Sequence, residues 1–219
     1  MPFAAWSLSL AVLTTVPPTP APAFAAAAAR QGLRPQVLRL ALQAHAQAVA
    51  AGAAMRDRLT VIDFTLASRE RRLWVLDLAA QRVVAHELVA HGRGTGDDMA
   101  RRFSNRPGSL ASSLGTFVTG ATYQGRHGLS LRLRGLDRGL NDQAAARGIV
   151  IHGAEYVNDE IVGKLGRLGR SQGCPALSPA AARRIIPLIR DGTVLFAYYP
   201  SPELRQALHT EQSAGPRRG

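Results

Sequence analysis

The sequence contains one cysteine, Cys174, among 219 residues. It cannot form an internal disulfide, which excludes a small scaffold held together by such bonds. Neither a second cysteine nor an H-x-x-x-H spacing accompanies it, so the sequence supports no metal site. Two roles remain open for the lone thiol: a small buried hydrophobe, which is the usual role of a free cysteine, or a reactive group.

Lysine and aromatic residues are also scarce. Lys164 is the only lysine and aromatic residues make up 5% of the chain, although the formal net charge is +12. The arginines that carry this charge are scattered, with no long basic run and few aromatic side chains on which bases would stack. We therefore do not expect nucleic-acid binding, whereas the charge suits an anionic polymer such as a cell-wall glycopeptide.

Long apolar runs are missing too, so the mature chain has no candidate membrane-spanning helix. Near the N-terminus, an apolar run at residues 3–16 precedes a Pro-rich stretch and the tripeptide AFA at 23–25. This order is typical of a secretory signal peptide, although no basic residue precedes Arg30. The alternative is an Ala/Pro-rich tail. We expect export to the periplasm or the cell envelope.

The spacing of apolar residues predicts how the rest of the chain is organised. Residues 34–54 have helical spacing without a breaker before Gly52. From residue 59, short apolar runs separated by turn signals are typical of antiparallel strands, and residues 94–115 indicate a long loop. We expect an α+β domain that is mostly β, with flanking helices. The expected segments are residues 1–29 (signal peptide and linker), 30–56 (N-terminal helix), 57–200 (catalytic domain) and 201–219 (polar, frayed tail).

A reactive cysteine needs a group that takes its proton, because a free thiol has a pKa of about 8.5. Among the six histidines, His152 has the best context. It ends the apolar run at 149–151, so a rigid strand would hold it, and Gly153 leaves space beside the ring. We therefore expect His152 to pair with Cys174, and the thiol to be accessible and partly ionised.

The residues around Cys174 suit acyl transfer. Gly173 tolerates unusual backbone dihedrals and close approach by a substrate, and Pro175 has no N–H. An oxyanion hole at this turn would therefore use the N–H groups of Gly173 and Cys174. Ser171 is placed to hydrogen-bond within the turn or near the site, and the alternative is that it only shapes the turn.

Four segments resemble a known family. They are FSNRPGSLASSLGTFVTG, YQGRHGLSLRLRGLDRGLND, RGIVIHGAEYV and LGRSQGCPAL. With S-x-G-C following a strand-ending H-G, they resemble the L,D-transpeptidase catalytic domain of the YkuD-like fold, and its murein L,D-transpeptidase subfamily in particular, over residues 59–199.

The resemblance implies a mostly β catalytic domain that acts on peptidoglycan stem peptides outside the cytoplasmic membrane, without a cofactor. By position, it implies that Cys174 is the nucleophile and His152 the general base. It also implies that Gly173 and Cys174 supply the oxyanion hole and that Ser171 is the serine of the motif.

Two positions depart from the commoner family pattern. Ala176 stands where an arginine usually follows the cysteine by two residues, and Gln172 stands where a histidine often precedes the glycine. The substrate carboxylate then needs another partner, for which Arg170 is a candidate, the alternative being an ordinary solvated arginine. Further substrate-binding candidates are Tyr123 and His127. The alternative for His127 is a simple turn histidine.

The sequence thus predicts a cysteine acyltransferase. The Cys174 thiolate would attack the carbonyl of the third stem residue, and the side-chain amine of another stem would capture the acyl-enzyme. An L,D-carboxypeptidase shares the same nucleophile and differs only in using water for the capture. A non-catalytic wall-binding module is a third possibility, against which the intact set of motif residues argues. Neither the acceptor amine nor the oligomeric state can be read from the sequence.

Overall fold

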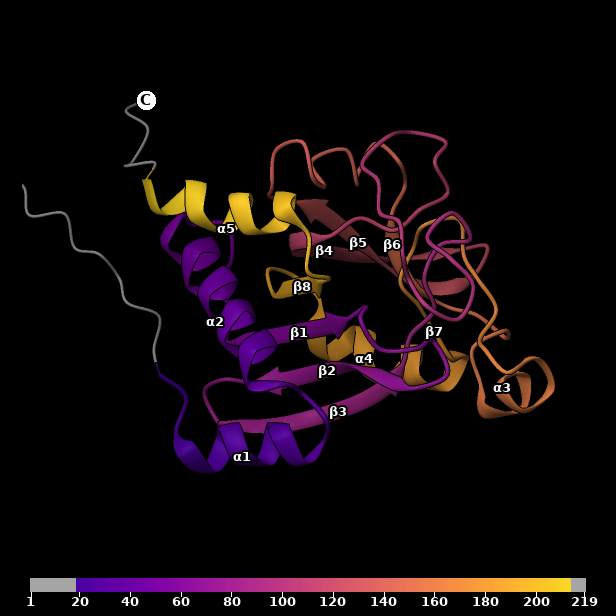
Figure 1. The fold of residues 1–219 in the computed structure, drawn as a ribbon, viewed down its shortest axis with the longest axis horizontal. Helices are drawn as coiled ribbons and strands as arrows, with labels where there is room; N and C mark the ends of the chain where they lie inside the picture. The colour runs from indigo at the N-terminus through magenta and orange to yellow at the C-terminus, as the bar shows by residue number, and fades with distance from the viewer. Residues whose placement is uncertain (1–18, 214–219) are drawn as a thin grey trace, which may run out of the picture.

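The computed structural model describes residues 19–213, and side chains up to Leu208 (Figure 1). The helices of this part are α1 (Pro22–Arg30), α2 (Pro35–Ala50), α3 (Asp159–Leu165), α4 (Pro179–Ile189) and α5 (Pro202–Ser213). Its strands are β1 (Arg58–Asp63), β2 (Arg71–Asp77), β3 (Arg82–Leu88), β4 (Gly115–Gly125), β5 (Gly128–Gly135), β6 (Val150–Gly153), β7 (Ala176–Leu177) and β8 (Val194–Tyr198). The apolar run at 3–16 lies outside the described residues. Within them, no helix is long and apolar enough to cross a membrane.

The strands join in one eight-stranded sheet with the order β3-β2-β1-β8-β4-β5-β6-β7. Most neighbours are antiparallel, as the short apolar runs predict, but the pairs β1–β8 and β6–β7 are parallel. The last strand therefore lies in the middle of the sheet, between β1 and β4. The expected mostly β α+β domain with flanking helices is confirmed.

The first two strands are buried on both faces, which explains their nearly continuous apolar sequences. Ile62 of β1 and Leu73 of β2 pack into one hydrophobic cluster. Their neighbours Val61 and Trp74 point to the opposite face of the sheet and pack into a second cluster. Helices α1 and α2 cover the Val61 face, and α4 contributes to the cluster around Ile62 (Figure 1). The sheet is thus held between two apolar cores.

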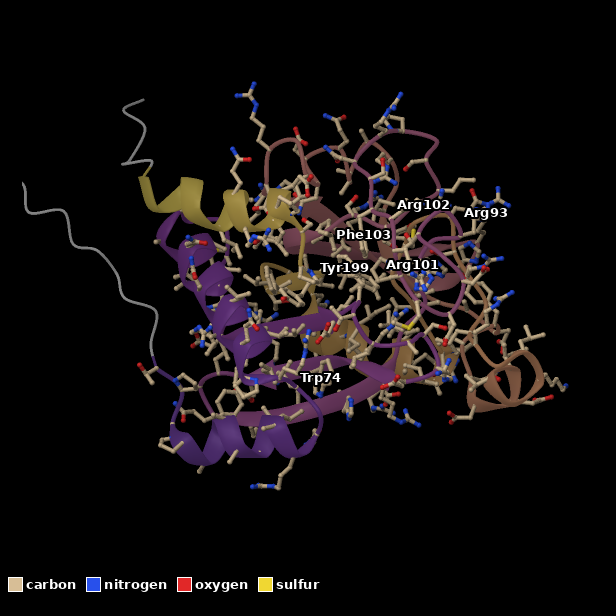
Figure 2. The ribbon with its side chains drawn as sticks, in the orientation of Figure 1. Trp74, Arg93, Arg101, Arg102, Phe103 and Tyr199 are labelled. Atoms are coloured by element: carbon tan, nitrogen blue, oxygen red, sulfur yellow. The ribbon has the colours of Figure 1, made fainter. Side chains whose placement is uncertain are left out.

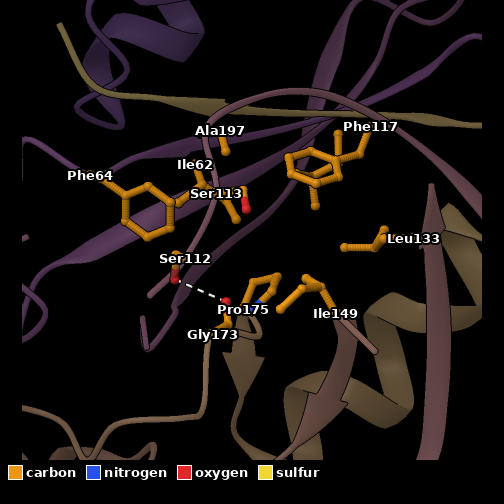
Figure 3. A pocket seen from close by; sticks show the side chains of 11 residues that line it. Ile62, Phe64, Ser112, Ser113, Phe117, Leu133, Ile149, Gly173, Pro175 and Ala197 are labelled. Atoms are coloured by element: carbon orange, nitrogen blue, oxygen red, sulfur yellow. Dashed lines mark hydrogen bonds between the residues drawn. The ribbon is translucent and has the colours of Figure 1, made fainter. Parts of the chain in front are cut away.

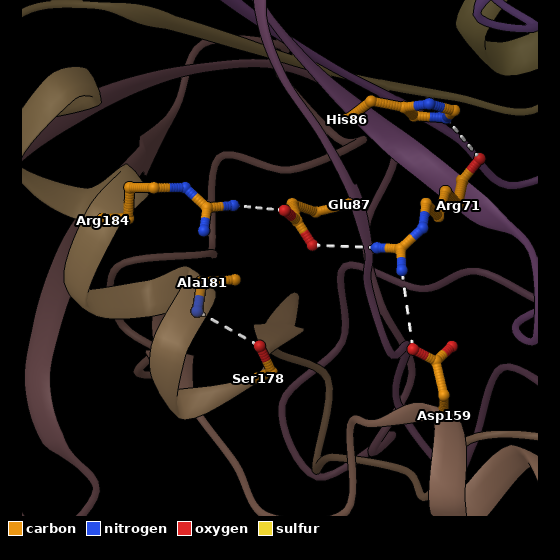
Figure 4. Close-up of polar contacts among 7 residues, drawn as sticks. All are labelled: Arg71, His86, Glu87, Asp159, Ser178, Ala181 and Arg184. Atoms are coloured by element: carbon orange, nitrogen blue, oxygen red, sulfur yellow. Dashed lines mark hydrogen bonds and ion pairs between the residues drawn. The ribbon is translucent and has the colours of Figure 1, made fainter.

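A serine side chain caps the start of helix α4. The Ser178 side chain accepts a hydrogen bond from the Ala181 N–H at 3.1 Å, and Pro179 occupies the first turn (Figure 4). The buried residues of the helix form one face: Ala181, Ala182, Ile185, Ile186 and Ile189. Because α4 packs against β5 and β6, it supports from behind the strand that carries His152.

Ion pairs connect the helices to the outer strands (Figure 4). Glu87 in β3 accepts hydrogen bonds from Arg71 in β2 and from Arg184 in α4. Arg71 also lies 3.5 Å from a carboxylate oxygen of Asp159, at the start of α3. Exposed pairs of this kind stabilise a fold only slightly, so the packing of apolar side chains contributes more to the position of α4 than these ion pairs do.

Both ends of the described chain differ from the expectation. Residues expected to belong to a linker form α1, where Phe24 is buried. Residues expected to be a frayed tail form α5, where Leu204 and Leu208 are buried and the Leu208 carbonyl accepts a hydrogen bond from Gln43. The sequence signals were weak because short Ala-rich or polar helices depend on tertiary packing for their stability. The helix predicted at 34–54 exists as α2.

The long loop predicted at 94–115 is confirmed, since residues 89–114 contain no regular helix or strand. We call this segment the 89–114 loop. Backbone hydrogen bonds order it, including those from Gly94 to Leu110 and from Ser104 to Ser112. The Phe103 ring packs 5.0 Å from that of Tyr199 and so attaches the loop to the end of β8 (Figure 2).

Candidate active site

The pairing of β6 with β7 brings the two predicted catalytic residues into one region. His152 lies opposite Ala176 in the parallel register, and Cys174 precedes Ala176 by two residues. The chain between the strands folds back so that the S-Q-G-C turn lies beside the end of β6. His152 is 4% exposed, and Cys174 is half-buried.

Ser171 closes the turn that carries the cysteine. Its hydroxyl donates to the Cys174 carbonyl oxygen at 2.6 Å and accepts from the Gly173 N–H at 3.0 Å. Position 173 requires glycine, because its φ is +125° and an added Cβ would lie 2.9 Å from the Ala111 oxygen. The Gly173 N–H, one of the two oxyanion donors expected from the sequence, is thus bonded within the turn.

Burial disfavours the ionised form of the Cys174 thiol. The Val150 N–H points at the sulfur from 3.5 Å, and the thiol donates to the Gly148 oxygen at 3.7 Å. Burial raises the pKa of Cys174 and outweighs the Val150 N–H and the charges of Arg147 and Arg126, which lower it. The expectation of a partly ionised thiol is therefore wrong, because the Gly and Pro neighbours in the sequence do not reveal burial.

His152 is prepared to accept a proton. Its Nδ1 lies 2.8 Å from the Gly153 carbonyl, which can only accept, so Nδ1 carries the hydrogen and Nε2 keeps its lone pair. Burial lowers the pKa of His152, and the nearby His127 and Arg126 lower it further against the opposing effect of the Gly153 bond. Among the described residues, no hydrogen bond joins the thiol to this ring, so proton transfer requires the thiol to turn away from Gly148.

The three predicted substrate-binding residues have different surroundings. The His127 ring stacks on that of His152, with centroids 4.5 Å apart. Tyr123 lies in the cross-strand row that contains Ser130 and His152, and therefore on the same face of the sheet. Arg170, in contrast, pairs with Asp97 of the 89–114 loop at 2.5 Å. The structure thus gives Arg170 a carboxylate partner within the protein.

Sequence reasoning missed Arg147, which holds one wall of the site. Its guanidinium donates to the Ser104 and Ala111 carbonyls at 2.6 Å each, and also to the hydroxyls of Ser109 and Ser113. Five residues before His152, it links the strand that carries the base to the 89–114 loop. Its position just before the apolar run at 149–151 is the only signal in the sequence.

A second missed group positions the cysteine turn from the other side. The Ser171 N–H donates to the His91 carbonyl at 3.0 Å, and the Arg93 N–H donates to the Ser171 carbonyl at 2.8 Å. His91 itself is held through Nδ1 by the fully buried Arg72 at 2.8 Å. Burial lowers the pKa of His91 to about 4 and that of Arg72 to about 9. The His91 ring is fully buried.

The space beneath the turn is too small for a substrate. A cavity of about 10 Å³, roughly enough for one water molecule, lies among apolar core side chains (Figure 3). Ser112 lines this cavity, and its hydroxyl donates a hydrogen bond to the Gly173 carbonyl at 3.0 Å. Within residues 19–213, no group of three potential ligands is arranged to hold a metal ion.

Comparisons with known proteins agree with this fold. A family model described as the L,D-transpeptidase catalytic domain matches residues 29–198. Solved structures similar to the chain include an L,D-transpeptidase from Mycobacterium smegmatis, with 17% identity, a TM-score of 0.40, and 65% of this chain and 59% of that chain covered. Another is an L,D-transpeptidase from Stackebrandtia nassauensis, with 14% identity, a TM-score of 0.39, and 83% and 78% covered.

The helical cell shape determining protein Pgp2 from Campylobacter jejuni is also similar, with 12% identity, a TM-score of 0.43, and 76% and 60% covered. The chain spans less than two thirds of the length of the Mycobacterium smegmatis structure. No curated protein matches. Because the family model covers more than half of the sequence, the chain belongs to the L,D-transpeptidase catalytic domain family.

Proposed function

We propose that the protein is a peptidoglycan L,D-transpeptidase, which cross-links third stem residues through an acyl-enzyme on Cys174. The observation that carries this proposal is the register of β6 and β7, which brings the strand-ending His152 beside the S-Q-G-C turn. Family membership supports a peptidoglycan substrate. A substrate of this kind lies outside the cytoplasmic membrane, so the proposal includes export of the chain.

In the first step, the Cys174 sulfur attacks the carbonyl carbon of the third stem residue and its proton passes to His152 Nε2. The resting pair is a neutral thiol and a neutral imidazole, so proton transfer accompanies the attack instead of preceding it. As the tetrahedral intermediate collapses, the bond to the terminal D-Ala nitrogen breaks. The imidazolium returns the proton to that amine, which leaves as free D-Ala.

The negative charge on the tetrahedral oxygen requires backbone donors. The Cys174 N–H lies next to the sulfur and is the donor that the turn leaves for this oxygen. The Gly173 N–H joins it only if its 3.0 Å bond to the Ser171 hydroxyl opens. Ser171 acts in this proposal as the residue that positions the turn through its bond to the Cys174 carbonyl.

In the second step, the side-chain amine of another stem attacks the thioester. His152 takes the proton of this amine, the sulfur leaves, and the new amide links two third residues. If water attacks instead, the product is a shortened stem, which is the activity of an L,D-carboxypeptidase. The two reactions share every protein group named here, so only the product distinguishes them.

The test uses purified protein and a stem tetrapeptide donor, with and without an acceptor peptide. Intact-protein mass spectrometry should show the mass of a tripeptide acyl group on Cys174, and liquid chromatography with mass spectrometry should show cross-linked dimers. A tripeptide product without dimers would instead identify a carboxypeptidase. Peptidoglycan binding without any Cys174 adduct would indicate a non-catalytic wall-binding module and overturn the proposal.

A further inference from the structure

The hairpin between β4 and β5 extends over the histidine of the site. Its tip consists of Arg126 and His127, between the paired residues Gly125 and Gly128. The His127 ring stacks on His152, and Arg126 Nε donates to His127 Nε2 at 3.0 Å. This series of contacts connects Arg126 to the proposed general base through its Nε atom, and the Arg126 residue is exposed.

A second arginine projects from the same hairpin. In β5, Ser130 pairs with His152 and Arg132 pairs with Val150, so the side chains of Ser130 and Arg132 lie on the face of the sheet that carries His152. The Arg132 guanidinium lies over the Tyr123 ring, 4.6 Å from its centroid, and is exposed. The Val150 N–H in turn contacts the Cys174 sulfur.

Neither arginine has a carboxylate partner among the ion pairs of the described residues. Two arginines near the site are, in contrast, occupied: Arg170 pairs with Asp97, and Arg147 donates to four oxygens of the 89–114 loop. The positive charge of Arg126 reaches both reacting groups, because it lowers the pKa of Cys174 and of His152. The β4–β5 hairpin thus carries two arginines without a carboxylate partner on the face of the sheet that carries His152.

We propose that Arg126 and Arg132 form an anion subsite that holds a carboxylate of the donor stem peptide. This inference rests on the proposed function and adds the groups that select the donor. A guanidinium binds a carboxylate through two parallel N–H bonds, and Arg132 is already ordered by its contact with Tyr123. The donor has two carboxylate sources, the terminal D-Ala and the side chain of a diamino acid at the third position.

The experiment measures acylation of Cys174 by three donors: the free acid, a donor with its terminal carboxylate amidated, and a donor with the third-residue carboxylate amidated. Arg126→Gln and Arg132→Gln should each raise KM for the free acid at least about tenfold, with a smaller change in kcat, because a charged hydrogen bond is lost. The donor that lacks the recognised carboxylate should bind wild-type protein more weakly and respond to neither substitution. The amidated donor that behaves in this way shows which of the two carboxylates the arginines bind.

Arg134→Gln is the matched control. Arg134 is exposed, lies on the same face of β5, and pairs with Val118, further from His152. The Arg134→Gln substitution should leave KM for the free-acid donor unchanged. Binding of the same donors to Cys174→Ser protein, measured by calorimetry, separates affinity from chemistry.

The subsite proposal is overturned if the wild type is acylated but the two variants affect the acid and both amidated donors alike, or if Arg134→Gln has the same effect. Failure of the wild type to form any acyl-enzyme would instead overturn the proposed function, so the two failures are distinguishable.

Discussion

The imidazole rings of His127 and His152 stack with centroids 4.5 Å apart and an interplanar angle of 25°. One ring belongs to a hairpin tip and the other to the end of a buried strand, so the contact joins a surface element to the centre of the site. It also brings the charge of Arg126 close to the proposed base.

Replacing the nucleophile should abolish the reaction without unfolding the protein. Cys174→Ser keeps nearly the same shape, but a hydroxyl is a far weaker nucleophile, so cross-linking should fall at least about a hundredfold. His152→Ala should lose a similar amount, and the double variant little more, because the two groups act as one unit. Dimer formation is followed by mass spectrometry, with circular dichroism as the folding control. Near wild-type dimer formation by Cys174→Ser would exclude it as the nucleophile.

The pH dependence of kcat/KM should change when the charge of Arg126 is removed. This charge lowers the pKa of His152, so Arg126→Gln should raise that pKa and move the acidic limb of kcat/KM to higher pH. Arg134→Gln should leave the limb in place. An acidic limb that moves to lower pH, or stays unchanged in Arg126→Gln, would show that the charge does not act on the base.

Iodoacetamide should reveal the resting state of the thiol. Because burial raises the pKa of Cys174, its alkylation rate in the folded protein should rise only above the pH range of a free cysteine. Arg147→Met removes a charge that lowers this pKa and should move the profile further upward, whereas Arg147→Lys should restore most of the shift. A profile below that of free cysteine would contradict the protonated resting thiol.

The cysteine turn should tolerate no side chain at position 173. Gly173→Ala places a Cβ 2.9 Å from the Ala111 oxygen at a φ of +125°, which should cost about 1–3 kcal/mol and displace the turn. Gly163→Ala is the control, because an added Cβ there meets nothing within 4 Å in helix α3. Chemical denaturation measures both variants. Equal stability of the two would show that the backbone at Gly173 is not constrained.

The parts of the site that lie close together in sequence could be predicted, and those that depend on packing could not. The strand that carries His152 follows from a local apolar run, and the helix start capped by Ser178 follows from a local Ser-Pro pair. The pKa of Cys174 and the buried pair of Arg72 and His91 depend on surroundings assembled from distant segments. The sequence shows that Arg170 is charged, but only the fold shows that Asp97 neutralises it.

The central position of β8 has a consequence for how the protein is made. This strand joins β1 to β4, so the hairpins formed early in synthesis become one sheet only after residues 194–198 emerge from the ribosome. Contacts between such distant parts of a chain form slowly, because a large loop must close first. Until these residues are available, the β1–β2–β3 part and the β4–β7 part of the sheet remain unjoined, and the backbone groups of β1 and β4 that pair with β8 lack their partners.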